Sequence, residues 1–461
     1  MEALKVQEIL EATGGILRKG DRDIEITDIC TDSRKAGKGV LFVPLKGERY
    51  DGHDFIVNAL QAGAAAFITE RDMEIPMEGA CEIKVKDTLA ALHDMARYYR
   101  SKFKIPFIAV TGSVGKTTTK EMVSSVMEQK FNVLKTQGNF NNEIGLPLTV
   151  FRLNSYHDIA VTEMGMSGFG EIKKLVSIVN PQVAIITNIG SAHIEKLGSQ
   201  ENILKAKMEV FYKFTADNTA ILNGDDPLLY NLKGKLPFKT VFYGIDNNEC
   251  DIKAKNIISY GEEGSTFCVD IDGREYEVKV PLIGRHNIYN ALASIAAGRV
   301  YNMEMNSIIK GIALSKPEKM RLDIFEAKGI KVINDCYNAS PESMKAALSV
   351  LMQIQSRGRK IAILGDMLEM GHWAGQAHRK VGEEVQKCGI DYLFTVGYNG
   401  KDIAKGAIDA GMPVHKVFSF DSNDEAIQKI DEFLKQGDVV LVKASRGMRM
   451  ESISEHIRGV G

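Results

Sequence analysis

The sequence contains little that is typical of a secreted, membrane-spanning or nucleic-acid-binding protein. Its six cysteines lie far apart and form no C-x-x-C pair, which argues against a zinc ribbon and against a disulfide framework. No apolar run reaches the roughly 18 residues that a membrane span needs. The net charge of −2 gives no electrostatic reason to expect binding to nucleic acid or to a membrane surface. We therefore expect a protein of the reducing cytoplasm that spans no membrane.

Two further features are missing, and the composition is otherwise ordinary. No internal repeat and no low-complexity tract interrupts the chain. The first ten residues hold acids among apolar residues and resemble an amphipathic helix rather than a signal peptide. With 461 residues, 44% of them hydrophobic and 26% charged, the chain can build ordinary folded cores in roughly two to four domains.

The patterns along the chain divide it into three regions. Residues 1–103 predict a small α/β domain, with a strand within residues 40–45 and a small-residue helix at residues 62–66. The stretch 102–106 is basic and ends in proline, which predicts a hinge. The second region, residues 104–314, follows this hinge.

Residues 104–314 predict a central domain built on a mostly parallel, doubly wound sheet. Apolar stretches alternate with helical patterns there, which is typical of such sheets. The candidate strands are 107–110, 159–162, 183–187 and 219–222, and the candidate helices include 170–179, 200–214 and 287–297. Residues 250–280 differ, because short alternating runs around Gly264 and Asp272-Gly273 predict β-hairpins.

Residues 315–461 predict a second doubly wound unit, a Rossmann-like C-terminal domain. Its candidate strands are 331–335, 360–364, 392–396 and 439–442, with helices such as 341–355 and 375–387. No G-x-G-x-x-G follows the first of these strands, so a dinucleotide site is not expected there. The predicted fold class is therefore α/β in three domains, with the ligands at the carboxyl ends of the parallel strands.

The strongest local motif is V-T-G-S-V-G-K-T-T-T-K, which stands between an apolar strand and a helical pattern. Strand, glycine-rich turn, Lys-Thr and helix form an arrangement that cradles phosphates, because successive N–H groups can point at phosphate oxygens. Lys116 can neutralise the β- and γ-phosphates, and the Thr117 hydroxyl can ligate Mg²⁺. Val110 stands where the common, longer loop has a glycine, and a plain strand-to-helix turn is the alternative. The expected phosphate cradle comprises Gly112, Ser113, Val114, Gly115, Lys116, Thr117 and Thr118.

Three other residues of the central region could take part in chemistry. Glu163 ends a predicted strand beside the phosphate loop, where a carboxylate suits Mg²⁺, although it could equally be a solvated strand-end acid. His193 follows another strand and could bind a metal or act as an acid or base; a loop histidine held by hydrogen bonds is the alternative. Lys207 lies in a helical pattern, and periodicity cannot distinguish a solvated lysine from a buried functional one.

Several polar residues could read a nucleotide or a polar substrate. The segment 136–145 is dense in amides and glycine, which suits either a ligand-reading loop or a turn-rich connector. Asn287 or Asn290 could pair with a base edge, while Asn287 could equally cap its helix. In the third region Asp335 could accept a hydrogen bond from a ribose hydroxyl.

Cationic residues near the start and the end of the third region complete the candidate site. Lys443 and Arg446 stand at a strand end, where cations can meet carboxylates or phosphates. Arg321 stands near the start of the same region. Each signal is weak alone, and together with Asp335 they outline a cleft between the second and third regions.

These motifs occur in the order typical of the Mur ligases, and the whole chain closely resembles that family. Mur ligases extend the peptide of the bacterial cell-wall precursor. The shared stretches are T-G-S-V-G-K-T-T-T, T-E-M-G-M, N-I-G-S-A-H, A-K-M-E, G-R-H-N-x-x-N-A-L-A, D-x-Y-N-A-S-P-E-S-M and V-K-A-S-R-G. The ordered set is far more specific than any one motif.

Within the family, three stretches resemble the ligase that adds D-alanyl-D-alanine to UDP-N-acetylmuramoyl-tripeptide. They are T-Q-G-N-F-N-N-E-I-G-L-P, D-C-Y-N-A-S-P-E-S-M and L-G-D-M-L-E-M-G. The D-N-P-R-like motif of the preceding ligase is missing. The resemblance implies an ADP-forming amide ligase of peptidoglycan synthesis that uses ATP and Mg²⁺ and passes through an acyl phosphate. We expect it to act as a monomer on a tripeptide whose third residue is lysine or diaminopimelate.

The resemblance also implies roles in binding ATP and metal. Lys116 and Thr117 would hold ATP phosphates and magnesium, and Lys207 matches a lysine that some relatives carry as a carbamate beside a second magnesium. The magnesium ligands would be Thr117, Glu163, His193 and Lys207. The other ATP contacts would be Asn287, Arg321 and Asp335. The residues expected to act in catalysis are Lys116, Glu163, His193, Lys207 and Arg321.

The two remaining substrates would contact other parts of the chain. Ser33 and Arg34 would lie near the nucleotide of the UDP-sugar, in the N-terminal domain. The residues expected near the muramoyl-peptide or the incoming dipeptide are Thr136, Asn139, Asn142, Asn338, Lys443 and Arg446. At Cys336-Tyr337-Asn338 the chain departs from the family's frequent D-Y-A-H, which bears on the ribose contact beside it.

Two other classes of function compete with this one. A related ligase, such as the folate polyglutamate enzyme or an earlier Mur enzyme, would share the ATP chemistry and differ in the amine that it accepts. A phosphate-loop nucleotide switch would share the loop alone, and its typical N-K-x-D motif is missing from this sequence.

Overall fold

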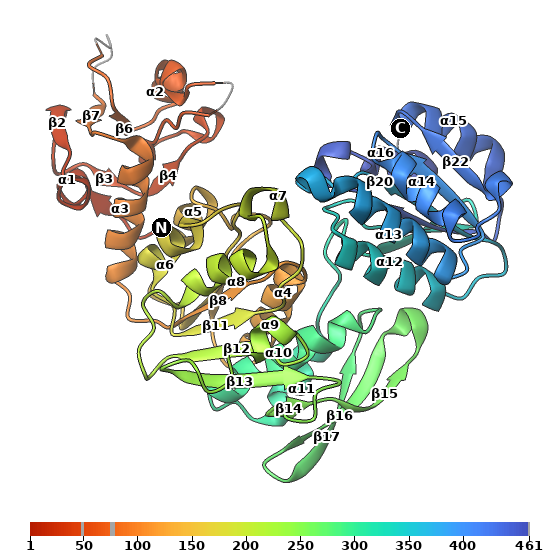
Figure 1. The fold of residues 1–461 in the computed structure, drawn as a ribbon. Helices are drawn as coiled ribbons and strands as arrows, with labels where there is room; N and C mark the ends of the chain where they lie inside the picture. The colour runs from red at the N-terminus through yellow and green to blue at the C-terminus, as the bar shows by residue number, and fades with distance from the viewer. Residues whose placement is uncertain (48–49, 74–78, 460–461) are drawn as a thin grey trace.

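The computed structural model of the chain describes residues 1–47, 50–73 and 79–459, arranged as three α/β units along an open curve (Figure 1). The N-terminal unit contains a five-stranded sheet of order β2-β7-β6-β5-β4 and a two-stranded sheet of β1 and β3. Its strands are β1 Leu4–Lys5, β2 Ile16–Lys19, β3 Glu25–Ile26, β4 Asp28–Cys30, β5 Val40–Phe42, β6 Ala66–Thr69 and β7 Cys81–Lys84. Its α-helices are α1 Val6–Thr13, α2 Ile56–Gln61 and α3 Thr88–Ser101.

The prediction of a helix at residues 62–66 is wrong. The helix α2 ends at Gln61, and Ala66 already belongs to the buried strand β6. Gly63 has a φ of +100°, which a continuing right-handed helix does not allow. The small residues therefore form the turn between a helix and a strand.

The central unit is a seven-stranded, wholly parallel sheet of order β14-β13-β12-β11-β8-β10-β9. Its strands are β8 Phe107–Thr111, β9 Val133–Lys135, β10 Ile159–Glu163, β11 Val183–Ile186, β12 Thr219–Asn223, β13 Lys239–Gly244 and β14 Ile252–Lys253. The helices before β14 are α4 Lys116–Met127, α5 Gly145–Val150, α6 Glu171–Val179, α7 Ile194–Leu197, α8 Gln200–Met208 and α9 Pro227–Tyr230. The helix expected over 200–214 thus ends at Met208 as an α-helix.

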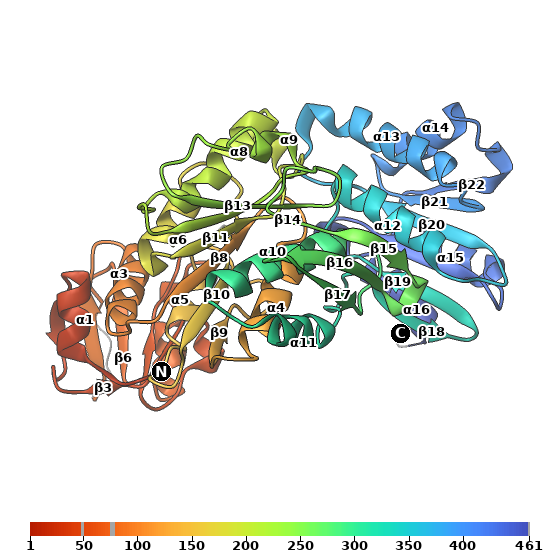
Figure 2. The same cartoon turned by 90° about the horizontal axis from the view of Figure 1, so that it is seen from below.

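Helices cover both faces of this sheet, with α6, α8 and α9 on one face and α4, α10 His286–Val300 and α11 Met305–Ala313 on the other (Figure 2). Because neighbouring residues of a strand point to opposite faces, Phe107 and Ala109 join one core while Ile108 and Val110 join the other. This explains why β8 is a continuous apolar run, as buried parallel strands are.

An antiparallel three-stranded sheet follows β14 and contains the expected hairpin. Its strands are β15 Lys255–Ser259, β16 Ser265–Ile271 and β17 Arg274–Val280. The turn between β16 and β17 places Asp272 at φ +51° and Gly273 at φ +77°, the conformation that two-residue hairpins favour. Only β14 departs from the hairpin prediction, since it extends the parallel sheet.

The C-terminal unit is a six-stranded sheet of order β18-β19-β23-β20-β21-β22, parallel except for β18. Its strands are β18 Asp323–Ala327, β19 Ile330–Asn334, β20 Lys360–Gly365, β21 Tyr392–Val396, β22 Val417–Phe420 and β23 Val439–Lys443. Its helices are α12 Pro341–Gln353, α13 Ala374–Lys387, α14 Gly400–Asp409, α15 Asn423–Phe433 and α16 Glu451–Arg458. The prediction of a Rossmann-like unit is confirmed. Among the described residues of the whole chain, no helix is long and apolar enough to cross a membrane.

Candidate active site

The phosphate loop lies at the carboxyl end of β8, where the chain turns into α4. Gly112 has a φ of +147° and Gly115 a φ of +84°, values that favour glycine. A Cβ on Gly112 would lie 1.9 Å from Thr187 Oγ1, so a larger residue does not fit. The helix begins at Lys116, which places the positive end of its dipole at the loop.

Asn188, which follows β11, fixes the shape of this loop. Its Oδ1 accepts the N–H of Val114 at 2.9 Å, and its Nδ2 donates to the carbonyl of Val114 at 3.0 Å. The Ser113 N–H donates to the Asn188 carbonyl at 3.0 Å, and Ser113 Oγ accepts the N–H of Gly190 at 2.8 Å. Sequence reasoning missed Asn188, although its place directly after a predicted strand was a usable signal.

Lys116 folds back over the loop that precedes it. Its Nζ donates to the carbonyls of Gly112 at 2.9 Å and Ser113 at 3.1 Å. Burial lowers the pKa of Lys116, the negative charge of Glu163 opposes that shift, and the positive charge of Arg321 adds to it. Charges from both the central and the C-terminal unit therefore act on Lys116.

Glu163 is buried at the end of β10 and is held by the amide-rich segment. Its Oε1 accepts from Asn141 Nδ2 at 2.8 Å, and its backbone N–H donates to Thr136 Oγ1 at 3.1 Å. Thr136 has no exposed surface, and its carbonyl accepts from the buried Lys120 at 2.9 Å. The other carboxylate oxygen, Glu163 Oε2, is buried and meets no hydrogen-bond donor among the described residues. The alternative interpretation of Glu163 as a solvated acid is therefore excluded. Asn141 is a contact of Glu163 that the sequence analysis did not predict.

His193 and Lys207 lie in different surroundings. His193 has a φ of +64°, and its Nδ1 lies 2.5 Å from Oε2 of Glu369 in the C-terminal unit. Lys207 on α8 is 1% exposed, which excludes a solvated surface lysine. Its pKa lies well below the ordinary value because of burial, with a smaller contribution from the charge of Lys116. The sequence analysis gave Glu369 no role, although it lies in the stretch L-G-D-M-L-E-M-G that carries the resemblance.

On the side of the C-terminal unit, the buried Lys443 forms an ion pair with the partly buried Asp335 at 2.6 Å. Lys443 also donates to the Asn338 carbonyl at 2.9 Å, and the N–H of Leu322 donates to the second oxygen of Asp335 at 3.1 Å. Arg321 lies with its guanidinium carbon 4.0 Å from the centre of the Tyr337 ring. Of the expected group, Arg321, Asp335 and Lys443 are thus brought together at one cavity, with Asp335 already paired.

Asn287 and Asn290 point inward from the first turns of α10. Asn287 Nδ2 donates to the carbonyl of Ile283 at 2.8 Å, and α10 has no side-chain cap. Asn290 joins Asn287 to the Thr119 hydroxyl, through bonds of 2.9 Å each. The capping alternative for Asn287 is therefore wrong, and Asn290 supports the phosphate-loop helix.

A cavity of about 990 Å³ lies between the central and C-terminal units. The expected residues that line it are Ser113, Val114, Gly115, Lys116, Thr117, Thr118, Asn142, Glu163, His193, Asn287, Arg321, Asp335, Asn338 and Lys443. The expected residues outside its lining are Gly112, Thr136, Asn139, Lys207, Ser33, Arg34 and Arg446. Arg446 instead pairs with Glu451 at 2.9 Å.

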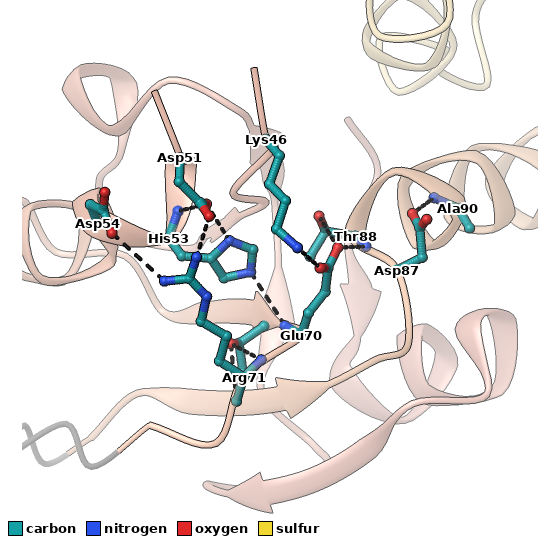
Figure 3. A network of polar contacts seen from close by, with 10 residues as sticks. Lys46, Asp51, His53, Asp54, Glu70, Arg71, Asp87, Thr88 and Ala90 are labelled. Atoms are coloured by element: carbon teal, nitrogen blue, oxygen red, sulfur yellow. Dashed lines mark hydrogen bonds and ion pairs between the residues drawn. The ribbon is translucent and has the colours of Figure 1, made fainter. Parts of the chain in front are cut away.

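The N-terminal unit has its own polar network (Figure 3). The buried His53 lies with Nδ1 2.6 Å from Asp51 Oδ1, and its Nε2 accepts the N–H of Glu70 at 3.3 Å. The Glu70 carboxylate binds Lys46 at 2.5 Å and accepts both the N–H and the hydroxyl of Thr88, the first residue of α3. The network therefore joins the loop after β5 to the long helix that packs on the central unit.

Ser33 and Arg34 lie apart from this network, in a short 3-10 helix, Ser33–Lys35. Asp32 accepts the backbone N–H of Arg34 and pairs with its guanidinium at 2.8 Å, which lowers the pKa of Asp32 to about 2. The Arg34 side chain is largely exposed. The guanidinium is thus paired with Asp32 at the surface of the N-terminal unit.

Comparison with known proteins follows the same three units. The Mur ligase family, catalytic domain matches residues 25–100, the Mur ligase middle domain residues 110–298, and the Mur ligase, glutamate ligase domain residues 320–446. The chain is 40% identical to the UDP-N-acetylmuramoyl-tripeptide–D-alanyl-D-alanine ligase of Bacillus subtilis (strain 168), covering 97% of both chains.

Solved structures show the same likeness. A crystal structure of MurF from Acinetobacter baumannii matches with a TM-score of 0.91 at 30% identity, covering 100% of this chain and 99% of that one. MurF ligase from Thermotoga maritima, solved in complex with ADP, matches with a TM-score of 0.81 at 30% identity, covering 94% and 97%. With all three units matched in order, the chain belongs to the Mur ligase family.

Proposed function

We propose that this chain joins D-alanyl-D-alanine to UDP-N-acetylmuramoyl-tripeptide at the expense of ATP, in the synthesis of peptidoglycan precursors. One observation carries the proposal: the phosphate loop, a buried acid with an unpaired oxygen and the cations of the C-terminal unit line one cavity. The names of the relatives supply the two acceptors. The enzyme would act as a cytoplasmic monomer, with no nucleic acid partner.

The proposed chemistry activates a carboxylate that is otherwise a poor electrophile. The γ-phosphoryl group moves from ATP to a terminal carboxylate oxygen of the tripeptide. An acyl phosphate forms, and ADP is the leaving group. The amine of the dipeptide then attacks the carbonyl carbon and loses a proton, while the bond to the phosphate oxygen breaks and phosphate leaves. Phosphoryl transfer depends on positioning and charge neutralisation, which Lys116 and Arg321 would supply.

The residues present fit a magnesium ion. Glu163 Oε2 is a buried carboxylate oxygen without a donor in the described part of the chain, and an oxygen ligand of this kind suits Mg²⁺. Thr117, Glu163 and His193 would hold the ion, and Lys207, as a carbamate, a second one. The described residues contain no group of three or more His, Cys, Asp or Glu that could hold a metal, so phosphates and water would complete the coordination. Bound magnesium would add positive charge at the phosphates.

The three substrates would occupy different units, taken as residues 1–103, 104–314 and 315–461. Ser33 and Arg34 would bind the UDP part of the precursor, and Asn139 and Asn142 its peptide, with Thr136 holding Glu163 in place. Asn287 and Asp335 would contact the adenosine of ATP. The residues proposed for the incoming dipeptide are Asn338, Lys443 and Arg446.

The test is phosphate release from ATP with the UDP-tripeptide present and D-alanyl-D-alanine added or withheld. We expect sustained release only with both acceptors. Release with a single amino acid in place of the dipeptide would favour an earlier Mur ligase or a folate-type ligase. Nucleotide-dependent partner binding without release would favour a switch protein.

A further inference from the structure

A carboxylate of the C-terminal unit contacts His193, a residue of the central unit that lines the cavity. Glu369 lies in the loop after β20, and its Oε2 is 2.5 Å from His193 Nδ1, a residue 176 positions away in the chain. The carbonyl of Glu369 also accepts the N–H of Glu195 at 3.4 Å. In Figure 1 the helix α7, which follows His193, lies beside the C-terminal unit. The contact thus joins the C-terminal unit to the central unit at His193, the candidate metal ligand.

The loop that holds Glu369 is fixed by its own unit. The N–H of Met367 donates to the buried His378 at Nε2 (2.8 Å), and the N–H of Leu368 donates to Ser445 Oγ (2.9 Å). Glu369 itself has a φ of +62°, and His193, which it contacts, has a φ of +64°. Non-glycine residues adopt such values at a cost and only where the surroundings determine them. The backbone conformations of both residues are therefore determined by their surroundings.

The bond leaves one ring nitrogen of His193 available. With Nδ1 donating to the carboxylate, Nε2 carries the lone pair, and no described residue bonds to it. His193 lines the same cavity as Glu163 and Thr117. A carboxylate on the far nitrogen is the arrangement that orients histidine ligands of metals.

We propose that Glu369 is a positioning residue, which orients the His193 imidazole so that Nε2 can bind the divalent cation accompanying ATP. This inference rests on the proposed function, because it takes His193 as a ligand of that cation. Since Glu369 belongs to the C-terminal unit, the metal site is complete only when this unit is docked as in the structure. The C-terminal unit would thus contribute to ATP activation as well as to binding the dipeptide.

A second contact between the same two units provides a matched control. Glu342, in the first turn of α12, accepts the N–H of Ser191 at 2.9 Å and its hydroxyl at 3.0 Å. Ser191 stands two residues before His193, so Glu342 holds the same loop without contacting the imidazole. Glu342→Ala removes a docking contact, whereas Glu369→Ala removes a docking contact and the partner of His193.

The experiment measures binding of Mn²⁺ to the full chain with a non-hydrolysable ATP analogue, by electron paramagnetic resonance. We expect Glu369→Ala to weaken Mn²⁺ binding by about 10- to 100-fold, the usual effect of removing a partner behind a metal ligand. Glu369→Gln, whose amide oxygen can still accept the N–H, should recover most of the affinity. Glu342→Ala should stay near wild type. Pulsed resonance should show imidazole nitrogen coupled to Mn²⁺ in wild type and lose it in His193→Asn.

Three results would overturn the inference: unchanged affinity in Glu369→Ala, equal weakening in Glu369→Ala and Glu342→Ala, or no nitrogen coupling in wild type. Half of the Glu369 side chain is exposed, so its substitution leaves the core intact. Failure of the proposed function looks different, because wild-type protein would then release no phosphate with both acceptors present.

Discussion

Lys443 and Asp335 form an ion pair at the ends of two adjacent strands, with Nζ and Oδ2 2.6 Å apart and the lysine side chain 2% exposed. The strands β23 and β19 are parallel neighbours, so their carboxyl ends bring together residues 108 positions apart. Asp335 therefore lines the cavity with one carboxylate oxygen already paired with the Lys443 ammonium. Its second oxygen holds the N–H of Leu322, next to Arg321.

We expect Lys443→Met to destabilise the C-terminal unit by about 1–3 kcal/mol, because the partly buried Asp335 carboxylate loses its charged hydrogen-bond donor. The chain's one tryptophan, Trp373, lies in this unit, so its fluorescence during denaturant unfolding measures the loss. The double variant Lys443→Met/Asp335→Asn should recover part of it. A single variant as stable as wild type would show that the pair contributes nothing.

We expect Lys116→Ala to lower phosphate release by at least about 10³-fold, since the charge it places on the transferred phosphoryl group is worth a few kcal/mol in the transition state. Binding of the UDP-precursor, measured by calorimetry, should persist because that substrate is assigned to the N-terminal unit. The exposed Lys235→Ala is the matched control. A folded variant that lost phosphate release and precursor binding to the same extent would contradict the assignment of substrates to units.

In protein without metal and nucleotide, the free energy of unfolding should depend on pH because of Lys207. Burial depresses the pKa of its amine well below 10.5, so between the folded and the unfolded pKa values the unfolded chain binds a proton that the folded chain does not. Stability therefore rises with pH between the folded and unfolded pKa values. We expect Lys207→Met to unfold at a higher temperature than wild type at pH 7, by about a few degrees. The difference should shrink as the pH approaches 10; a constant difference would show that Lys207 is charged when buried.

His53→Leu should weaken precursor binding while leaving binding of the ATP analogue intact. The substitution leaves the N–H of Glu70 without its acceptor and removes the imidazole from the Asp51 carboxylate, which keeps its pairing with Arg71 (Figure 3), at a cost of about 1–3 kcal/mol. Hydrogen exchange should therefore rise first in the N-terminal unit. The exposed His415→Leu is the control; equal effects of both substitutions on exchange would exclude the network as the cause.

The local parts of the site could be predicted from the sequence. A buried strand, a glycine turn, Lys116 and a helix are contiguous, and each follows from the preferences of neighbouring residues. The structure confirms β8 and α4 with their expected order. The family could also be predicted from the sequence, because its motifs are short contiguous stretches that occur in a fixed order along the chain. The helix expected at residues 62–66 failed because a run of small residues is equally suited to a turn and a buried strand.

The amino-acid sequence alone determined the phosphate loop, the α/β class and the membership of the Mur ligase family. Only the tertiary structure decided that Lys207 is buried, that Thr136 faces Glu163 instead of a cavity, and that Glu369 meets His193. The physical reason is distance along the chain. Burial and hydrogen bonding of these side chains depend on strands and loops dozens to hundreds of residues away, and no local pattern records which of them will become neighbours.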